Sequence, residues 1–231
     1  MELQDLLRTK GFSHFEERTS HAFRIDQNSD SGASVALQNV LQWIIADKER
    51  KVSLRIDDES LTILFGNYTN FEEAKPLYEE VLGAIEKTIA GMIYKELQLR
   101  YINCILMKDS VPNDWVTPAV LGMPNFQGLH RMASISETNY ETSAGSRLTV
   151  RCSSMASGLT LPPDLLPFEM ETALPLQSPK PFVLLENLHA KKSNEAAFSA
   201  QSCLKEFGEM RADIHTTFRK TVTLQALEKW K

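Results

Sequence analysis

Two sets of polar side chains in this sequence have the residue types to bind an anion. Arg211, His215 and Arg219 are spaced four residues apart, so on a helix they share one face. Arg100 and Asn103 lie in an otherwise apolar run. A guanidinium binds carboxylates and phosphates through paired hydrogen bonds, and an imidazole titrates near neutral pH. We predict these side chains as ligand-binding residues. The alternative for His215 is a half-buried helix histidine with satisfied hydrogen bonds.

Arg100 has two interpretations. Side chains alternate along a strand, so Arg100 lies on one face and Tyr101 and Asn103 lie on the other. As a structural group, Arg100 pairs with a carboxylate behind the sheet, for which Glu169 and Glu186 are candidates. As a functional group, it projects into a cavity between sheet and helix and clamps an anion. Tyr101 and Asn103 fix strand register and packing in the first case.

Residues for catalysis or metal binding are sparse. His130 and His189 stand at the ends of expected strands, where either is a candidate general acid or base for RNA cleavage. Asp57, Asp58 and Glu59 are candidates for holding a divalent cation, or else they form a hairpin turn. The sequence has no glycine-rich phosphate loop, HExxH or CxxC. We therefore expect no catalytic residue, no metal and no cofactor.

Composition describes an ordinary globular protein. The chain has 231 residues, 42% of them apolar and 24% charged, with a net charge of −5. This charge does not indicate nucleic acid as a partner, and does not exclude it. Three widely spaced cysteines favour a reducing compartment, and no apolar run is long enough to span a membrane. The first residues lack the features of a signal peptide. We expect a cytoplasmic protein without a membrane partner.

Apolar periodicity predicts both strands and helices. Strands are expected at about 35–46, 51–57, 60–66, 94–107, 128–139, 145–153 and 181–187, and long helices at about 70–90 and 194–220. Asn70 and Asn194 are the expected caps of the two helices. Six prolines between 162 and 181 predict loop or edge strand.

The fold class follows from this order of elements. We expect an α+β fold, a mainly antiparallel sheet with two long helices packed on one face. Residues 1–34 form a weakly patterned, variable segment that includes a loop near 28–32. Residues 35–231 form one domain, with 35–107 and 108–231 as two similar halves.

Several short motifs occur together in the order of a known family. They are the hairpin Lys51–Ile56 and Leu61–Phe65, the helix start Phe71-Glu72-Glu73, the strand Leu99-Arg100-Tyr101-Ile102-Asn103, and Ile214-His215 with Phe218 in the last helix. In this respect the chain resembles the sporadically distributed, largely uncharacterised prokaryotic family marked by an R-Y-I-N strand. Members usually begin with a strand that contains a proline and a glutamate, which this sequence lacks. The resemblance implies a prokaryotic, cytoplasmic α+β protein with a patchy genomic distribution.

The absence of catalytic motifs favours a non-enzymatic interaction or oligomerisation module. Its expected partner is itself or another protein. The patchy distribution of the family implies a component of an antiviral-defence or mobile-element-linked system. One alternative is a small anionic-ligand sensor with a cavity between the sheet and the C-terminal helix. The other is a metal-dependent or histidine-dependent nuclease.

Overall fold

A computed structural model describes residues 3–28, 32–107, 111–124, 126–129, 131–143, 145–166, 170–173 and 175–230, with backbone alone for 20–28 and 32–38. It confirms an α+β fold with antiparallel sheets. The chain divides into two compact units. Unit 1 comprises Met1–Thr88 with Phe168–Ala173, and unit 2 comprises Ile89–Pro167 with Leu174–Lys231. The division falls directly after the first long helix and not at residue 107, where the sequence predicted the boundary between two halves.

Unit 1 is a four-stranded antiparallel meander with a long helix. Its elements are α1 (Leu3–Thr9), β1 (Phe12–Asn28), β2 (Gly32–Asp47), β3 (Val52–Ile56), β4 (Leu61–Phe65) and α2 (Phe71–Thr88), and the strand order is β1-β2-β3-β4. The expected hairpin and the first long helix are confirmed. The description of residues 1–34 as weakly patterned misses a long strand, because β1 lies entirely within this segment.

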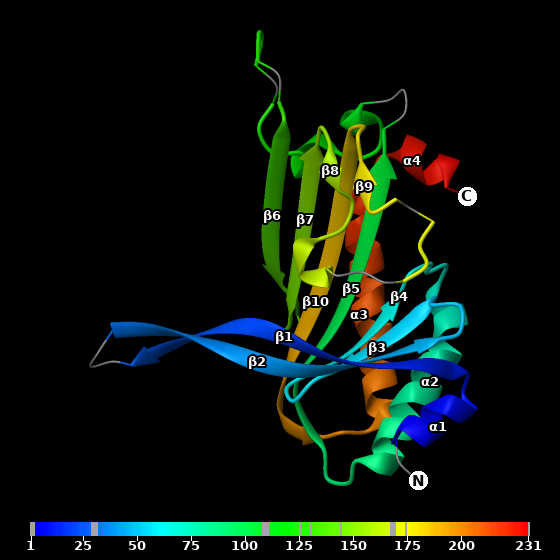
Figure 1. Ribbon diagram of the computed structural model, residues 1–231. Helices are drawn as coiled ribbons and strands as arrows, with labels where there is room; N and C mark the ends of the chain where they lie inside the picture. Colours follow the sequence, from blue (N-terminus) through cyan, green and yellow to red (C-terminus); the bar gives the residue numbers. More distant parts are fainter. Residues whose placement is uncertain are drawn as a thin grey trace. The chain divides into compact units, whose positions relative to one another are not determined.

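The first hairpin extends well beyond the sheet that it starts from. β1 and β2 pair from Phe12 and Asp47 to Asn28 and Gly32, whereas β3 covers only Trp43–Ala46 of β2. The outer part is therefore a two-stranded ribbon (Figure 1). β3 ends opposite Trp43, and at this point the core face of β2 passes from a buried Ile45 to an exposed Trp43.

Helix α2 begins where its capping residues predict. The Asn70 side chain accepts a hydrogen bond from the Glu73 backbone N–H at 3.0 Å and donates one to the Glu73 carboxylate at 2.6 Å. Pro76 lies inside the helix without ending it. Tyr78 faces the sheet, and its ring centroid is 5.2 Å from that of Phe65. Burial raises the pKa of the Tyr78 hydroxyl.

A short strap from late in the chain completes unit 1. The Glu171 backbone N–H donates to the Arg50 carbonyl at 2.9 Å, and the Ala173 N–H donates to the Asn67 side chain at 2.9 Å. The strap passes so close to Gly66 that an added Cβ would lie 2.1 Å from the Glu171 carbonyl oxygen. Only glycine permits this approach.

Unit 2 has a different strand order. Its principal elements are β5 (Ile93–Leu106), β6 (Ala133–Glu141), β7 (Arg147–Met155), β8 (Gly158–Leu159), β9 (Gln177–Ser178), β10 (Phe182–Ala197), α3 (Ala200–Thr221) and α4 (Leu224–Lys229). The main sheet has the order β5-β10-β7-β6, so the first strand lies beside the last as in a Greek key (Figure 1). Among its described residues, the proline-rich stretch contributes the short strand β9 and a 3₁₀ turn, in agreement with the predicted loop or edge strand.

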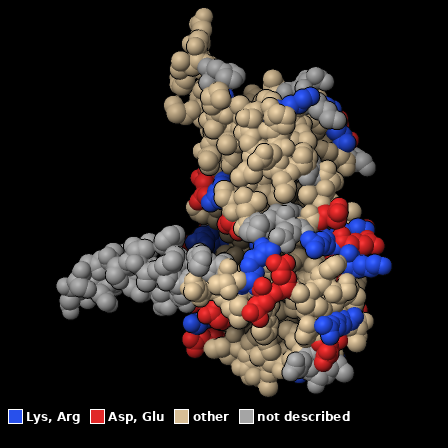
Figure 2. All heavy atoms as spheres, viewed as in Figure 1, with Lys and Arg blue, Asp and Glu red and all other residues tan. Residues whose placement is uncertain are grey.

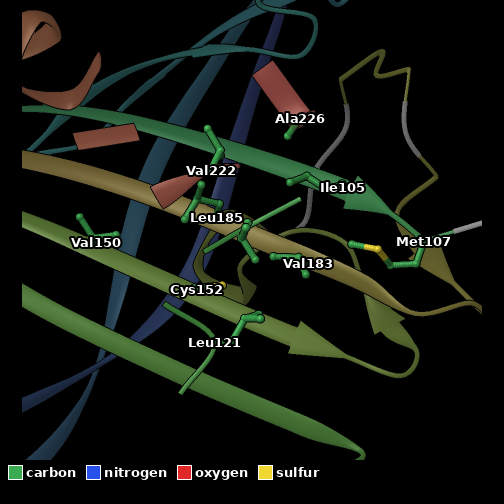
Figure 3. Packing of buried hydrophobic residues seen from close by; sticks show 10 residues of the cluster. Ile105, Met107, Leu121, Val150, Cys152, Val183, Leu185, Val222 and Ala226 are labelled. Atoms are coloured by element: carbon green, nitrogen blue, oxygen red, sulfur yellow. The ribbon is translucent and has the colours of Figure 1, made fainter. Parts of the chain in front are cut away.

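The core of unit 2 lies between one face of this sheet and the C-terminal helices. Val183 and Leu185 of β10 are completely buried there beside Cys152 and Val222 (Figure 3). Residues that alternate with Val183 and Leu185 lie on the opposite face of the sheet. The two faces therefore offer different environments to neighbouring side chains.

The start of the last helix differs from the sequence prediction. Residues 194–197 belong to β10, which continues past a bulge between Lys192 and Ala196, and α3 begins at Ala200. The long partner strand β5 explains this, because its first residues pair with Ala196 and Ala197. The prediction that Asn194 caps this helix is wrong. Each unit has its own sheet and one long helix, rather than two helices on one sheet.

Two glycine substitutions test the strap. Gly66→Ala should destabilise the protein by about 2 kcal/mol, because the methyl group displaces the Glu171 carbonyl. Gly83→Ala in α2, where an added Cβ meets nothing within 4 Å, should stabilise it by roughly 0.5–1 kcal/mol. Urea denaturation measures both. Equal effects of the two substitutions would contradict the close approach at Gly66.

Candidate functional site

A row of alternating charges crosses the sheet of unit 2. Glu186 of the central strand β10 contacts Arg100 of β5 at 2.5 Å and Arg151 of β7 at 3.3 Å. Arg151 also contacts Glu137 of β6 at 2.6 Å. Arg100 in turn forms a second ion pair, with Asp164, at 2.5 Å. One carboxylate thus joins two arginines, and the row reaches all four strands.

Strand register explains why these side chains meet. Glu186 is directly opposite Arg151, and Arg151 is directly opposite Glu137. Arg100 lies opposite Leu188, two residues along the strand from Glu186, which is within reach of a long side chain. The Glu186 side chain is only 6% exposed. A carboxylate at this depth needs these charged partners to offset its lost hydration.

The contacts change the acidity of two groups in the row. Burial lowers the pKa of the Arg100 guanidinium, but hydrogen bonds to Asp164 and Glu186 outweigh that effect and raise the pKa overall. The hydrogen bond from Arg100 lowers the pKa of Asp164. Both shifts favour the charged forms that make the ion pair.

The predicted carboxylate partner of Arg100 is confirmed for Glu186, whereas Glu169 lies outside the described residues. Asp164 was not foreseen, because a turn in a proline-rich loop carries no signal of its tertiary contacts. Arg100 faces away from α3, on the sheet face opposite Asn103. The structure therefore does not bring Arg100 to a space beneath the C-terminal helix.

The helical candidates lie on the outer part of α3. His215 and Arg219 are exposed and Arg211 is half-buried, while Ile214 faces the sheet. The half-buried histidine expected at this position is wrong, because the apolar face of α3 turns His215 toward solvent. A role of these residues in ligand binding stays a prediction.

A second polar cluster lies on the α3 face of the sheet. His189 is 3% exposed; its Nε2 lies 2.6 Å from the Ser146 hydroxyl and its Nδ1 lies 3.4 Å from the Met210 carbonyl. Because a carbonyl only accepts, Nδ1 carries the proton when both contacts are hydrogen bonds. The Ser146 hydroxyl then donates to Nε2 and accepts from Thr142, 2.7 Å away.

This cluster has the residue types of a serine hydrolase but not the access. The Asp213 carboxylate lies 3.7 Å from Nδ1 of His189, which is longer than a hydrogen bond. Ser146 is 4% exposed, and both neighbours occupy its hydroxyl. A substrate carbonyl cannot approach the Ser146 oxygen in this arrangement. The contacts instead tie the turn before β7, the strand β10 and the helix α3 together.

The remaining chemical candidates do not form a site in the described part of the chain. Asp57 accepts hydrogen bonds from the backbone N–H groups of Glu59 and Ser60 at 3.0 and 2.7 Å, which confirms the turn interpretation of this acidic stretch. His130 lies outside the described residues. Within those residues, no group of three or more histidine, cysteine, aspartate or glutamate side chains has an arrangement that could hold a metal.

Sequence reasoning missed a buried amide. Asn187 of β10 is fully buried, and its side-chain amide has no hydrogen-bond partner among the described residues. A hollow of about 170 Å³ lies near the bulge of β10, lined by Tyr94, Lys191 and Glu206 among others. It is smaller than ordinary ligand sites of ~300–1,000 Å³. None of the five predicted ligand-binding residues lines it.

Sequence reasoning also missed an apolar surface before β6. Five large apolar side chains are each more than half exposed there: Met123, Phe126, Leu129, Met132 and Ile135. We call these five residues the apolar surface. The stretch from Gly122 to Ser136 contains Arg131 as its only Lys, Arg, Asp or Glu. The segment projects beyond the end of β6, and its tip is free of charged side chains in Figure 2.

Polar contacts hold the base of this segment in place. Leu121 is buried in the core, and its carbonyl accepts a hydrogen bond from the Ser134 hydroxyl at 2.9 Å. Arg131 donates to the Met123 carbonyl at 2.8 Å. Gly122 has a φ of +74° and lies against Ser134, so the chain turns sharply here. The segment is therefore anchored at its start and at β6.

Comparisons with protein-family models, with curated proteins and with solved structures found no match to this chain. The resemblance to the R-Y-I-N family and the cytoplasmic location therefore stay predictions. In the part of the chain that the structure describes, every helix is too short or too polar to cross a lipid bilayer.

Removing the central carboxylate tests the charge row. Glu186→Gln should destabilise the protein by about 3 kcal/mol, because two arginines lose a buried counter-charge. Glu137→Gln, at the exposed end of the row, should cost less than about 1 kcal/mol. Urea denaturation at neutral pH measures both. A Glu186→Gln variant as stable as Glu137→Gln would contradict a central role for Glu186.

Acid should remove the contribution of Asp164. Because the pKa of Asp164 is lowered from 3.8 in the fold, its ion pair stabilises the protein above that pH and is lost as the pH falls through the lowered value. Asp164→Asn should therefore be less stable than the wild type at neutral pH and equally stable well below pH 3.8. Denaturant midpoints across this range measure the difference. A gap that persists or widens in acid would refute the ion pair.

Proposed function

We propose that this protein is a non-enzymatic protein-interaction module. Its docking surface comprises the apolar surface and the adjacent free edge of β6. The observation that carries the proposal is the exposure of the five apolar side chains within one anchored segment. Exposed groups of this kind on a folded protein mark sites of protein interaction.

The composition of the segment suits protein recognition. Methionine side chains are flexible and polarizable, so Met123 and Met132 can adapt to the surface of a partner. Phe126 and Leu129 supply larger apolar groups that lose water on contact. Hydrogen bonds from Ser134 and Arg131 hold the base of the segment, which lowers the entropy lost on binding.

The edge of β6 supplies a second means of recognition. β6 is the outer strand of its sheet, nine residues long, and pairs only with β7 among the described strands. Natural edge strands are commonly protected by lysine or proline, and the sequence of β6 contains neither. An extended segment of another chain can therefore add to the sheet through main-chain hydrogen bonds.

Selection of binding peptides tests this function without a known partner. Random peptides displayed on phage and long enough to pair with β6 should yield apolar, extended sequences that bind the whole protein. Ile135→Lys should weaken those peptides about tenfold, because it places a charge beside the bound strand.

A matched substitution controls for general changes in surface charge. Leu224→Lys changes a highly exposed leucine of α4, also in unit 2, and should leave peptide binding unchanged. If no peptides are enriched, or if Ile135→Lys binds them as tightly as Leu224→Lys does, the proposed docking surface is wrong.

A further inference from the structure

We infer that the partner on β6 is a second copy of this chain, paired antiparallel through β6 with the two-fold axis at Ser136. This inference rests on the proposed function of the same surface. A two-fold axis through an edge strand brings the same strand of each copy together, so one self-complementary sequence serves both sides.

The register follows from the charges on the strand. With the axis at Ser136, a residue of one copy lies opposite the residue of the second copy that is equally far from position 136 in the other direction along the chain. Arg131 then lies opposite Glu141 of the second copy, and Met132 lies opposite Tyr140 of the second copy. Both Met132 and Tyr140 are at least half exposed in the single chain. Opposite charges and apolar groups thus meet directly.

Neighbouring registers lose these matches. An axis at Glu137 places two glutamates directly opposite each other, which is destabilising. An axis at Ile135 or at Thr138 leaves Arg131 without Glu141 as its counterpart. The axis at Ser136 sets no like charges directly opposite each other, and it extends the pairing to Arg131 and Met132, which precede β6.

The interface joins two sheets into one. Each copy contributes the order β5-β10-β7-β6, so the pair forms a continuous eight-stranded antiparallel sheet. The apolar surfaces of the two copies then flank the new strand pair. Ile135 lies beside the second copy's Glu137, which its own Arg151 already neutralises. Glu137 of each copy lies diagonally across from Glu137 of the other, and the Arg151 of each copy offsets their repulsion.

Single cysteines test the axis directly. Residues directly opposite in antiparallel strands have Cα atoms about 4.5–5.5 Å apart, within the range of a disulfide. Ser136→Cys should therefore form an intermolecular disulfide under mild oxidation, seen as a dimer on non-reducing gels. Ser134→Cys alone should not, because its mate in the second copy is four residues away, about 13 Å along the strand.

Mixing two variants completes the test. Ser134 lies opposite Thr138 of the second copy, so a mixture of Ser134→Cys and Thr138→Cys should cross-link although neither does so alone. The wild type is the control for native thiols. Cys152 and Cys203 are buried, and burial raises the pKa of the half-buried Cys104 thiol to about 11.

Sedimentation velocity of the wild type separates the possible failures. A wild-type dimer with the expected cross-links supports the inference if Ser136→Lys converts it to monomer, because that substitution sets two lysines directly opposite each other. A dimer that cross-links through Ser134→Cys alone refutes the axis at Ser136. A wild type that stays monomeric at tens of micromolar refutes self-pairing, and peptide binding lost in Ile135→Lys would then still support the proposed function.

Discussion

The ion pairs of the Glu186 carboxylate are the interaction on which unit 2 depends most. The carboxylate lies in the central strand, almost fully buried, and it joins arginines from both neighbouring strands. A charge at this depth is costly alone and acceptable only when its partners are in place. Because Arg151 continues the row to Glu137, the same contact extends to the edge strand β6. The row thereby favours one register across the whole sheet, since a slip of one residue would move every charge to the other face.

This arrangement separates the two faces of the sheet by function. The face of Leu185 packs against the C-terminal helices and contains His189, whose hydrogen bonds link the sheet to α3. The face of Glu186 holds the ion pairs and the loop of Asp164. Ionisable side chains thus make their contacts within the fold on both faces of the sheet. The proposed interaction surface instead lies at the edge, where the backbone of β6 and the apolar surface are available to a partner.

Local patterns predicted elements where the signal was local. The cap at Asn70 and the turn at Asp57 depend on contacts over three residues, and both are confirmed. Predictions were wrong where residues that are distant in sequence but close in space determine the secondary structure. Residues 194–197 read as the start of a helix, yet they extend β10 because β5 continues beside them. The N-terminal segment reads as weakly patterned, yet its residues Phe12–Asn28 pair with β2 as a ribbon.

The sequence by itself determined the α+β class, the hairpin of β3 and β4, and the alternation that separates Arg100 from Asn103, since these follow from spacing along the chain. The sequence also indicated that Arg100, if it is buried, needs a carboxylate as its partner. Only the tertiary structure decided that the longer strands form two separate four-stranded sheets, that Asp164 completes the ion pairs, and that the apolar surface stays exposed. The physical reason is that burial and ion pairing depend on residues distant in sequence, whose approach no local spacing encodes.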